Sequence, residues 1–248
     1  MNAVLPTAAL GVLALAFVGC ASLPPPESYT AVRAVLPVVV DGRADEEDWS
    51  RAEWVTNFVD ITGDPAKKPV YPTRVKMLWD DQALYVYAEL TEPKVTATLT
   101  NRDDVVWHDN DFEIFIDTDD DGENYFEFEF NAANTLFDLF LTRPYSDPRG
   151  NFVMHQWNAD GIRSAVRVDG TLNDNRDIDR GWTLEAAIPN VALANGFELP
   201  LAFGRMLRVG FSRVEWLKKE REENWTWGAT GRIDMHMPWR WGKVLLGW

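Results

Sequence analysis

The sequence predicts an all-β fold: a β-sandwich of jelly-roll or immunoglobulin-like type, with about ten antiparallel strands and one or two short helical turns. Three observations lead to this prediction. Short segments with alternating apolar and polar residues recur along the chain, turn-forming residues separate them, and no long amphipathic helical pattern interrupts them. A chain of 248 residues with this pattern commonly forms a single domain.

The expected elements follow one another with short connections. Residues 38–40 form a first strand, and residues 45–49 form a helical turn with Asp45 as its N-cap. Residues 75–79 and 84–88 flank a turn and predict a hairpin. The remaining strands are expected at residues 114–117, 125–130, 136–141, 165–168, 182–188, 207–216 and 243–246, with a helical turn at 189–193.

The strand around residues 111–117 has the clearest alternation. One face is apolar and the other mostly acidic: Phe112, Ile114 and Ile116 against Asp111, Glu113, Phe115 and Asp117. Trp107 lies just before this strand. Sugar rings stack on flat apolar surfaces and their hydroxyls need fixed acceptors, so this pattern suits sugar binding. An ordinary solvated strand face is the alternative.

The next strand adds an electrostatic problem. If Ile116 pairs with Phe126, then Glu113 lies directly opposite Glu129, and like charges across a ladder are destabilising. An arginine, a metal ion, protonation or a ligand must offset them. We favour Arg213, because the apolar alternation of its strand becomes charged at Arg213 and Glu215.

Composition excludes several classes of partner. A formal net charge of −15 argues against nucleic acid and against electrostatic attachment to anionic lipid. The chain has no nucleophile elbow, P-loop or dinucleotide fingerprint. Asp111 and Glu113 share one wall, so they cannot attack a glycosidic bond from opposite sides. We therefore expect no catalytic residues and no enzyme activity.

The N-terminus predicts export. Residues 1–20 form a lipoprotein-type signal segment that ends in small residues and Cys20, the only cysteine in the chain. We expect Cys20 to carry a lipid that anchors the protein at the outer membrane or cell surface; an uncleaved N-terminal anchor is the alternative. Residues 21–33 are expected to form a Pro-rich tether, and residues 34–248 the domain.

An acidic turn suggests a metal site. Asp117, Asp119 and Asp121 alternate before Gly122, as at the opening of a calcium loop. The closing position for a bidentate Glu is Phe128, and no helices flank the turn, so a solvated acidic turn is the alternative. Three scattered His residues make zinc a poor candidate.

Taken together, these segments resemble the family 9 carbohydrate-binding modules, and more closely the stand-alone lipoproteins related to them. The resemblance covers nearly the whole mature domain and depends on the order and spacing of its pieces. These pieces are residues 40–42 with 45–49, 78–81 with 84–86, 107–117, 181–185 with 188–189, 211–216 and 225–227.

The resemblance implies non-catalytic carbohydrate binding that supports polysaccharide degradation. In that family two tryptophans sandwich a sugar at a chain end, and polar side chains bind its hydroxyls. Trp107 matches the first tryptophan, and Trp227, with Trp225 two residues away, matches the second. Glu129 stands where characterised modules have Arg. The expected ligand-binding residues are Trp107, Asp111, Glu113, Glu129, Asn131, Arg213, Glu215, Trp225 and Trp227.

The resemblance also implies structural calcium and no other required cofactor, with a polysaccharide or oligosaccharide as the partner. Two alternatives stay open. Related sandwiches of the DOMON-like group bind haem through Met, His or Lys, and Met77 with residues 235–237 could supply such ligands. A module associated with a glycoside hydrolase, with hydrolytic activity of its own, is the other alternative.

Overall fold

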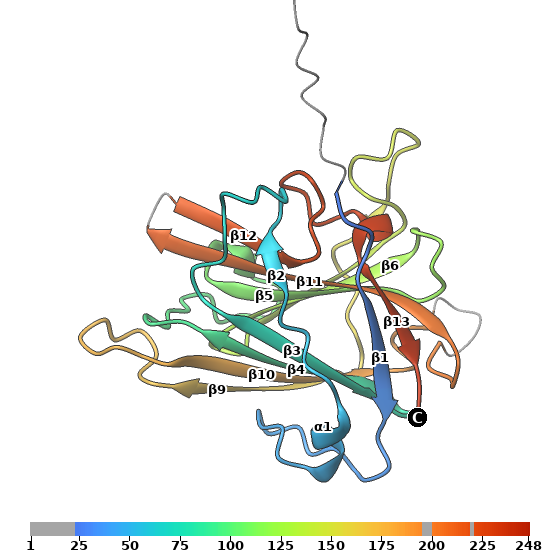
Figure 1. Ribbon diagram of the computed structural model, residues 1–248, viewed down its shortest axis with the longest axis horizontal. Coiled ribbons are helices and arrows are strands. Elements are labelled where there is room, and N and C mark those ends of the chain that lie inside the picture. The colour runs from blue at the N-terminus through green and yellow to red at the C-terminus, as the bar shows by residue number, and fades with distance from the viewer. Residues whose placement is uncertain (1–22, 195–199, 219–220) are drawn as a thin grey trace, which may run out of the picture.

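The protein is a β-sandwich in which two layers of strands pack face to face (Figure 1). The computed structural model describes residues 23–194, 200–218 and 221–248. Within these residues it contains 13 strands, so the predicted fold class is confirmed and the expected strand number was too low. The predicted signal segment and lipid site, residues 1–20 with Cys20, lie outside the described residues.

One layer, the β4 sheet, consists of five strands. They are, in spatial order, β1 (Ser28–Arg33), β3 (Thr73–Trp79), β4 (Ala83–Thr91), β10 (Gly181–Pro189) and β9 (Arg163–Asp169). The hairpin expected at residues 75–88 is formed by β3 and β4.

The other layer, the β5 sheet, carries the predicted acidic strand. Its order is β8 (Val153–Met154), β7 (Leu136–Leu141), β6 (Tyr125–Asn131), β5 (Asp111–Asp117), β11 (Met206–Lys218) and β13 (Gly242–Leu246). Beyond residue 211, β11 pairs instead with β12 (Arg221–Trp227), which pairs with β2 (Phe58–Asp60). The long strand β11 therefore pairs with β13 through its first half and with β12 through its second half.

The N-terminal segment corrects a prediction. The tether expected at residues 21–33 is wrong over Ser28–Arg33, because these residues form β1. This strand pairs in parallel with β13 and with β3, so it joins the two sheets. The all-antiparallel expectation fails at the same two pairings. Parallel pairing of the two ends of the chain leaves no local pattern in the sequence.

Helical structure is short. It comprises α1 (Glu47–Arg51) and the 3-10 turns η1 (Val106–His108) and η2 (Pro238–Arg240). The expected turn near residue 47 is present, but its N-cap is Glu46 rather than Asp45, without a side-chain capping bond. In the described part of the chain, no helix is long and apolar enough to cross a membrane.

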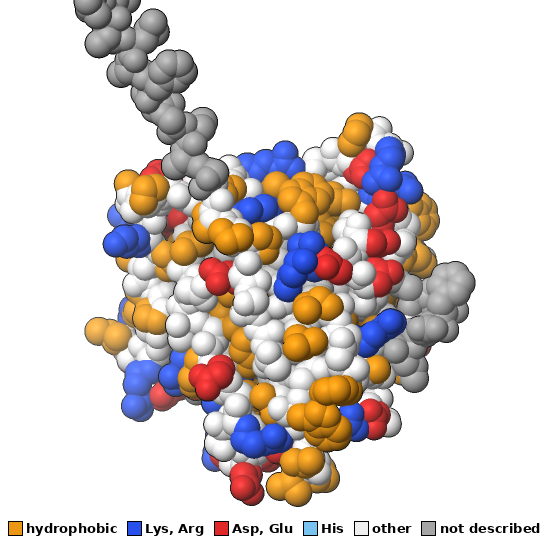
Figure 2. Space-filling view, turned by 45° about the vertical axis from the view of Figure 1, so that its right-hand side comes forward, with side chains coloured by type: hydrophobic (Ala, Val, Ile, Leu, Met, Phe, Trp, Pro, Cys, Tyr) orange, Lys and Arg blue, Asp and Glu red, His pale blue; other side chains and the backbone are white. Residues whose placement is uncertain are grey.

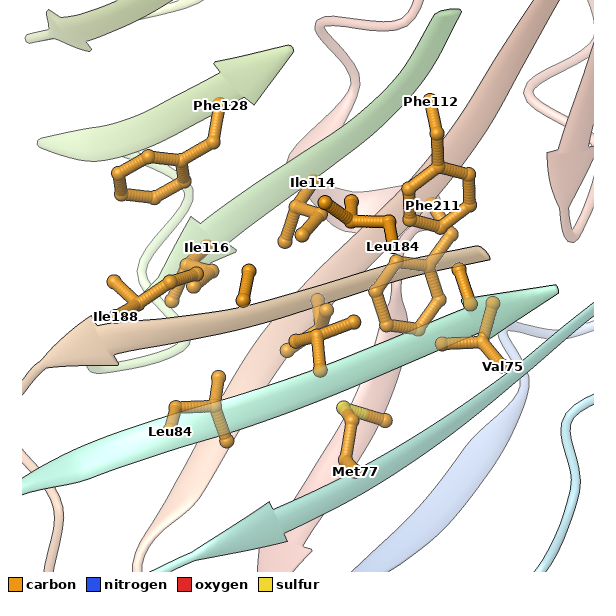
Figure 3. Close-up of a cluster of buried hydrophobic side chains, with 14 of the residues drawn as sticks. Val75, Met77, Leu84, Phe112, Ile114, Ile116, Phe128, Leu184, Ile188 and Phe211 are labelled. Carbon is orange, nitrogen blue, oxygen red and sulfur yellow. The ribbon is translucent and has the colours of Figure 1, made fainter. Parts of the chain in front are cut away.

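The core lies between the two sheets and is built by their inward-facing residues (Figure 3). From the β5 sheet, Phe112, Ile114 and Ile116 point inward, as the alternation predicts. From the β4 sheet, Leu84 and Leu184 meet them. Fully burying side chains of this size contributes about 1.5–3 kcal/mol each. This apolar packing fixes which face of β5 points outward.

The register of β5 is the feature that positions the site. Glu113 pairs with Glu129 of β6 and with Ser212 of β11. The predicted like-charge pair across the ladder is therefore confirmed. Residues paired in register share a face of the sheet, so all three side chains lie on the outer face. On the surface view of Figure 2, acidic and basic side chains are interspersed with apolar ones.

Candidate functional site

A cleft of about 460 Å³ lies on the outer face of the β5 sheet. It combines exposed aromatic residues with carboxylates of β5 and β6. Its main lining residues are Trp107, Glu113, Glu127, Glu129, Phe137, Leu139, Tyr145, His155, Asn224, Met235 and His236. A larger groove of about 710 Å³ lies beside residues 56–73, but none of the predicted site residues line it.

Trp107 stands at one wall of the cleft. Its position in η1 is held from β11, where Trp216 Nε1 donates a hydrogen bond of 3.0 Å to the Trp107 carbonyl oxygen. The Trp107 side chain remains 38% exposed, unlike the fully buried tryptophans of the core. An exposed indole fixed through its backbone is suited to contact a ligand.

Three carboxylates meet beneath the cleft. One oxygen of each of Asp111, Glu113 and Glu129 lies within 4.8 Å of the others. Glu113 and Glu129 line the cleft, whereas Asp111 is fully buried below it. The Val214 N–H donates a 3.2 Å bond to Asp111 Oδ1. The second oxygen of each group, Asp111 Oδ2, Glu113 Oε2 and Glu129 Oε2, is buried and has no hydrogen-bond partner.

Burial makes these groups hard to ionise. Desolvation raises the pKa of Asp111, Glu113 and Glu129 well above the ordinary range, and mutual repulsion adds to it. For Glu129 the repulsion comes first from Glu127 and then from Glu113. The cleft floor therefore favours a neutral or neutralised state.

The expected counter-charge is elsewhere. The prediction that Arg213 offsets Glu113 and Glu129 is wrong, because Arg213 pairs in register with Phe112 and shares its inner face. Arg213 is fully buried there and donates two bonds to Glu215 Oε2, of 3.0 and 2.6 Å. Its Nη2 atom also lies 3.9 Å from Glu92 Oε2. Arg213 and Glu215 thus form an internal ion pair, away from the cleft.

Trp225 and Trp227 also lie on the inner face. Trp227 stacks on Phe211 at 5.6 Å between ring centroids, and Gly242 provides the space, since a Cβ there would lie 2.4 Å from the indole. The Trp225 ring lies 5.2 Å from the Arg213 guanidinium. Their exposures are 1% and 3%, so neither offers a ring face to a ligand.

Asn131 is a structural residue of the β6 end. Its Nδ2 donates to the Leu99 carbonyl at 2.8 Å and to Asp109 Oδ2 at 3.1 Å. Its Oδ1 accepts from the Ala133 and Thr135 N–H groups, both at 3.0 Å. Every hydrogen-bonding position is used and the side chain is fully buried, so no group remains to bind a ligand.

Several cleft residues were not predicted. Tyr145, His155 and His236 come from connections after β7, after β8 and before η2, far apart in the sequence. Tyr145 is 52% exposed and its ring meets the His236 ring edge to face at 4.6 Å. No sequence pattern places these loops together. Glu127 had a signal, because it alternates with Glu129 on one face of β6.

The proposed haem ligands are not brought together. Met77 is buried in the core between the sheets, whereas Met235 and His236 line the cleft on the outer face. His236 Nδ1 is 2.9 Å from the Tyr125 hydroxyl, and its Nε2 lies 3.8 Å from Glu127 Oε1. One haem cannot be ligated from both faces of a packed sheet.

The predicted calcium loop has a partly suitable donor set. Carboxylate oxygens of Asp117, Asp119 and Asp121 lie within 4.8 Å of one another, as oxygen ligands of a hard cation would. Asp117 Oδ1 accepts from the Asp119 and Asp120 N–H groups, and its Oδ2 accepts from Gly122. The two outer carboxylates are exposed, so a cation there would compete with water.

Comparisons with known proteins agree on one family. Residues 40–247 match the model described as carbohydrate family 9 binding domain-like. Endo-1,4-beta-xylanase C of Paenibacillus barcinonensis is 34% identical over 151 residues, which cover 60% of this chain and 11% of that enzyme. Exoglucanase XynX of Acetivibrio thermocellus is 24% identical over 160 residues, covering 64% and 12%. The chain therefore matches only about a tenth of the length of these relatives.

Solved structures share the fold. A candidate carbohydrate-binding protein of Bacteroides uniformis has a TM-score of 0.71 at 18% identity, covering 89% of this chain and 99% of that one. A family 9 carbohydrate-binding module of Caldicellulosiruptor kristjanssonii, solved with cellotriose, has a TM-score of 0.61 at 18% identity, covering 89% and 94%.

Proposed function

Because the chain belongs to the carbohydrate family 9 binding domain-like family, we propose that it binds a carbohydrate in the cleft on the outer face of the β5 sheet. The observation that carries the proposal is one arrangement. Trp107, an exposed aromatic residue, lines the same cleft as Glu113 and Glu129, whose Oε2 atoms are buried acceptors without a donor. A ligand rich in hydroxyl groups supplies donors to such acceptors.

Aromatic stacking in the cleft involves other residues than the sequence suggested. Trp107 provides one exposed ring, and Tyr145 provides the other, in place of the buried Trp227. Planar side chains of this kind contribute large contact areas at a low entropic cost. We therefore propose that a sugar ring contacts Trp107 and that Tyr145 makes a second contact.

The charge of the cleft selects among glycans. Glu113, Glu127 and Glu129 all line it. No Lys or Arg is among the described residues that line the cleft, so none of them pairs with the charge of a uronic acid or a sulfated sugar, and we propose a neutral glycan. The relatives include a xylanase and an exoglucanase, and one structural neighbour holds cellotriose. Xylo-oligosaccharides and cello-oligosaccharides are therefore the ligands to test first, bound by a chain end as the family resemblance implies.

We propose that this binding is non-catalytic. Glycoside hydrolysis needs two carboxyl groups on either side of the scissile bond. Glu113 and Glu129 are cross-strand neighbours on one floor, so both would approach a sugar from below. The domain then serves polysaccharide degradation by holding the substrate.

The test is a calorimetric titration of the purified protein with xylotriose and cellotriose. Trp107→Ala should weaken binding by about 2–4 kcal/mol, as for aromatic anchors that become buried on binding. Trp248→Ala is the matched control, because Trp248 is 70% exposed and does not line the cleft. Unchanged affinity in a folded Trp107→Ala protein, or loss in both variants, would contradict the assignment of the site.

Cellular location remains a proposal from the sequence. Small residues before Cys20 support lipid attachment there, which would hold the domain at the outer membrane or cell surface. Metabolic labelling with a radioactive fatty acid should mark the protein, and Cys20→Ala should abolish the label. A label that persists in Cys20→Ala would place the attachment elsewhere.

A further inference from the structure

The carboxylate cluster beneath the cleft lacks a positive charge. Among the described residues, no Lys, Arg or His forms an ion pair with Asp111, Glu113 or Glu129. Arg213 lies on the other face of the sheet, and His236 approaches only Glu127. Each of the three residues is at least 96% buried and carries one oxygen without a hydrogen-bond partner.

A sugar alone does not resolve this cluster. Hydroxyl groups can donate hydrogen bonds to Glu113 and Glu129, but they carry no charge to balance the carboxylates. Asp111 does not line the cleft and is fully buried, so a sugar hydroxyl cannot reach its unpartnered oxygen. Leaving ionised carboxylates unpaired in such surroundings costs several kcal/mol each.

We propose that Asp111, Glu113 and Glu129 bind one divalent cation, Ca²⁺, beneath the floor of the cleft. All three donors are carboxylate oxygens, the ligand type that hard cations prefer. Two oxygens bound to the same Ca²⁺ at 2.3–2.6 Å lie at most about 5 Å apart. The observed separations, all within 4.8 Å, satisfy that limit.

The choice of Ca²⁺ over other ions follows from the surroundings. Zn²⁺ is usually held by sulfur or imidazole ligands, and none belongs to this cluster. Mg²⁺ demands near-ideal octahedral geometry, which carboxylates fixed by the register of β5 and β6 are poorly placed to provide. Ca²⁺ accepts irregular geometry and several carboxylates, and its remaining coordination positions would face the cleft between Glu113 and Glu129.

This site does not depend on the proposed carbohydrate function, since the cation binds without a glycan. It is also separate from the loop of Asp117, Asp119 and Asp121, in which both oxygens of Asp117 already accept backbone N–H bonds. The two clusters can therefore be tested by separate variants.

The experiment is a calorimetric titration of the chelator-stripped protein with Ca²⁺, repeated with Tb³⁺ while exciting tryptophan. Trp107 lines the cleft above the cluster and should sensitise the luminescence of bound Tb³⁺. Glu113→Gln and, separately, Asp111→Asn keep side-chain shape and remove one charge. Each should weaken Ca²⁺ binding at least about tenfold and abolish the tryptophan-sensitised signal.

The control is the double variant Asp119→Asn and Asp121→Asn, which should keep both the Ca²⁺ isotherm of the cleft site and the luminescence. Equal Ca²⁺ affinity in Glu113→Gln, Asp111→Asn and the parent would overturn the proposal, and so would no Ca²⁺ binding by the parent. Trp107→Ala separates the two proposals: if it loses the glycan and keeps Ca²⁺ binding by calorimetry, both stand. A parent that binds Ca²⁺ but no glycan would refute only the carbohydrate function.

Discussion

Two groups of buried carboxylates lie on opposite faces of the β5 sheet. On the inner face, Glu215 and Glu92 surround the Arg213 guanidinium, and Trp182 and Asn110 also donate to Glu92. On the outer face, no cationic side chain of the described residues pairs with Asp111, Glu113 or Glu129. Among the described residues, only the inner group contains its own positive charge.

The difference shows how a structural ion pair is distinguished from a binding site. Buried carboxylates alone do not mark function, because a protein can balance them with its own arginine. Unpartnered oxygens on residues that line a cleft, as in Glu113 and Glu129, point instead to a partner from outside the chain. Mutations in the inner cluster should therefore lower the stability of the fold, whereas mutations in the outer cluster should weaken the binding of ligand and cation.

The largest expected effect is on the inner cluster. Arg213→Met removes the positive charge that balances Glu215 and leaves Glu215 buried. The free energy of unfolding should fall by about 3–5 kcal/mol. Denaturant unfolding followed by tryptophan fluorescence measures it.

The matched control is Arg180→Met. Arg180 pairs with Asp169 on the surface, where 84% of its side chain is exposed, so the change should be within about 1 kcal/mol. Equal effects of the two substitutions would show that the inner ion pair contributes no more than a surface one.

The second prediction concerns stabilisation by calcium. At a Ca²⁺ concentration 100 times the dissociation constant, the parent should gain about 2.7 kcal/mol of unfolding free energy. The double variant Glu113→Gln and Glu129→Gln should gain none, because two of the three charged ligands are gone. Denaturant unfolding with Ca²⁺ or with chelator checks this, and an equal gain in both proteins would count against the outer site.

Glu185 provides an intermediate case: a buried carboxylate with hydrogen bonds but no cation. The Asp41 and Gly42 N–H groups donate to its Oε2 at 2.9 and 3.0 Å, while its Oε1 has no partner. Desolvation by burial raises the pKa of Glu185 from 4.5 to about 7. Backbone hydrogen bonds lower it, but by less than burial raises it.

The third prediction follows from the sign of this shift. Below pH 4.5 the Glu185 carboxyl is protonated in both the folded and the unfolded chain, and its contribution to the free energy of unfolding is fully present. Between pH 4.5 and about 7 the unfolded chain gives up this proton while the folded chain still holds it, so the free energy of unfolding falls across that window and levels off above it. In Glu185→Gln, the fall of the unfolding free energy with pH should be smaller than in the parent by about 1–3 kcal/mol. The measurement is the free energy of unfolding against pH for parent and variant. The same pH dependence in both proteins would refute the pKa assignment.

Alternation predicted the strand faces well, and its one failure is instructive. Glu113 opposite Glu129 followed from the pattern of β5 and β6, because a packed inner face allows only one register. Arg213 lies two residues after Phe211, a core residue on the same strand, so alternation alone predicts that its side chain points inward. Its charge was taken as a sign of exposure, whereas the buried partner Glu215 satisfies it.

Other features had no local signal. β1 pairs with β13 across most of the chain length, and this contact depends on how the two sheets close. The cleft wall formed by Tyr145, His155 and His236 depends on three loops meeting above one face. The positions of loops depend on how the strands pack. Sequence patterns could therefore identify the carboxylates of the cleft floor and Trp107, but not the loops that form the opposite wall.

The smallest expected effect belongs to the loop after β5, which the sequence singled out for calcium. Asp117 accepts backbone N–H bonds, and Asp119 and Asp121 are exposed, although Asp121 also accepts a bond from the Glu123 N–H group. Asp120 is balanced by Arg208 and by Lys243 at 3.4 Å. In chelator, Asp119→Asn with Asp121→Asn should change the unfolding free energy by no more than about 0.5 kcal/mol. If this variant, rather than Glu113→Gln with Glu129→Gln, abolished stabilisation by Ca²⁺, the loop would be the calcium site, and the outer cluster would be held neutral by protons instead.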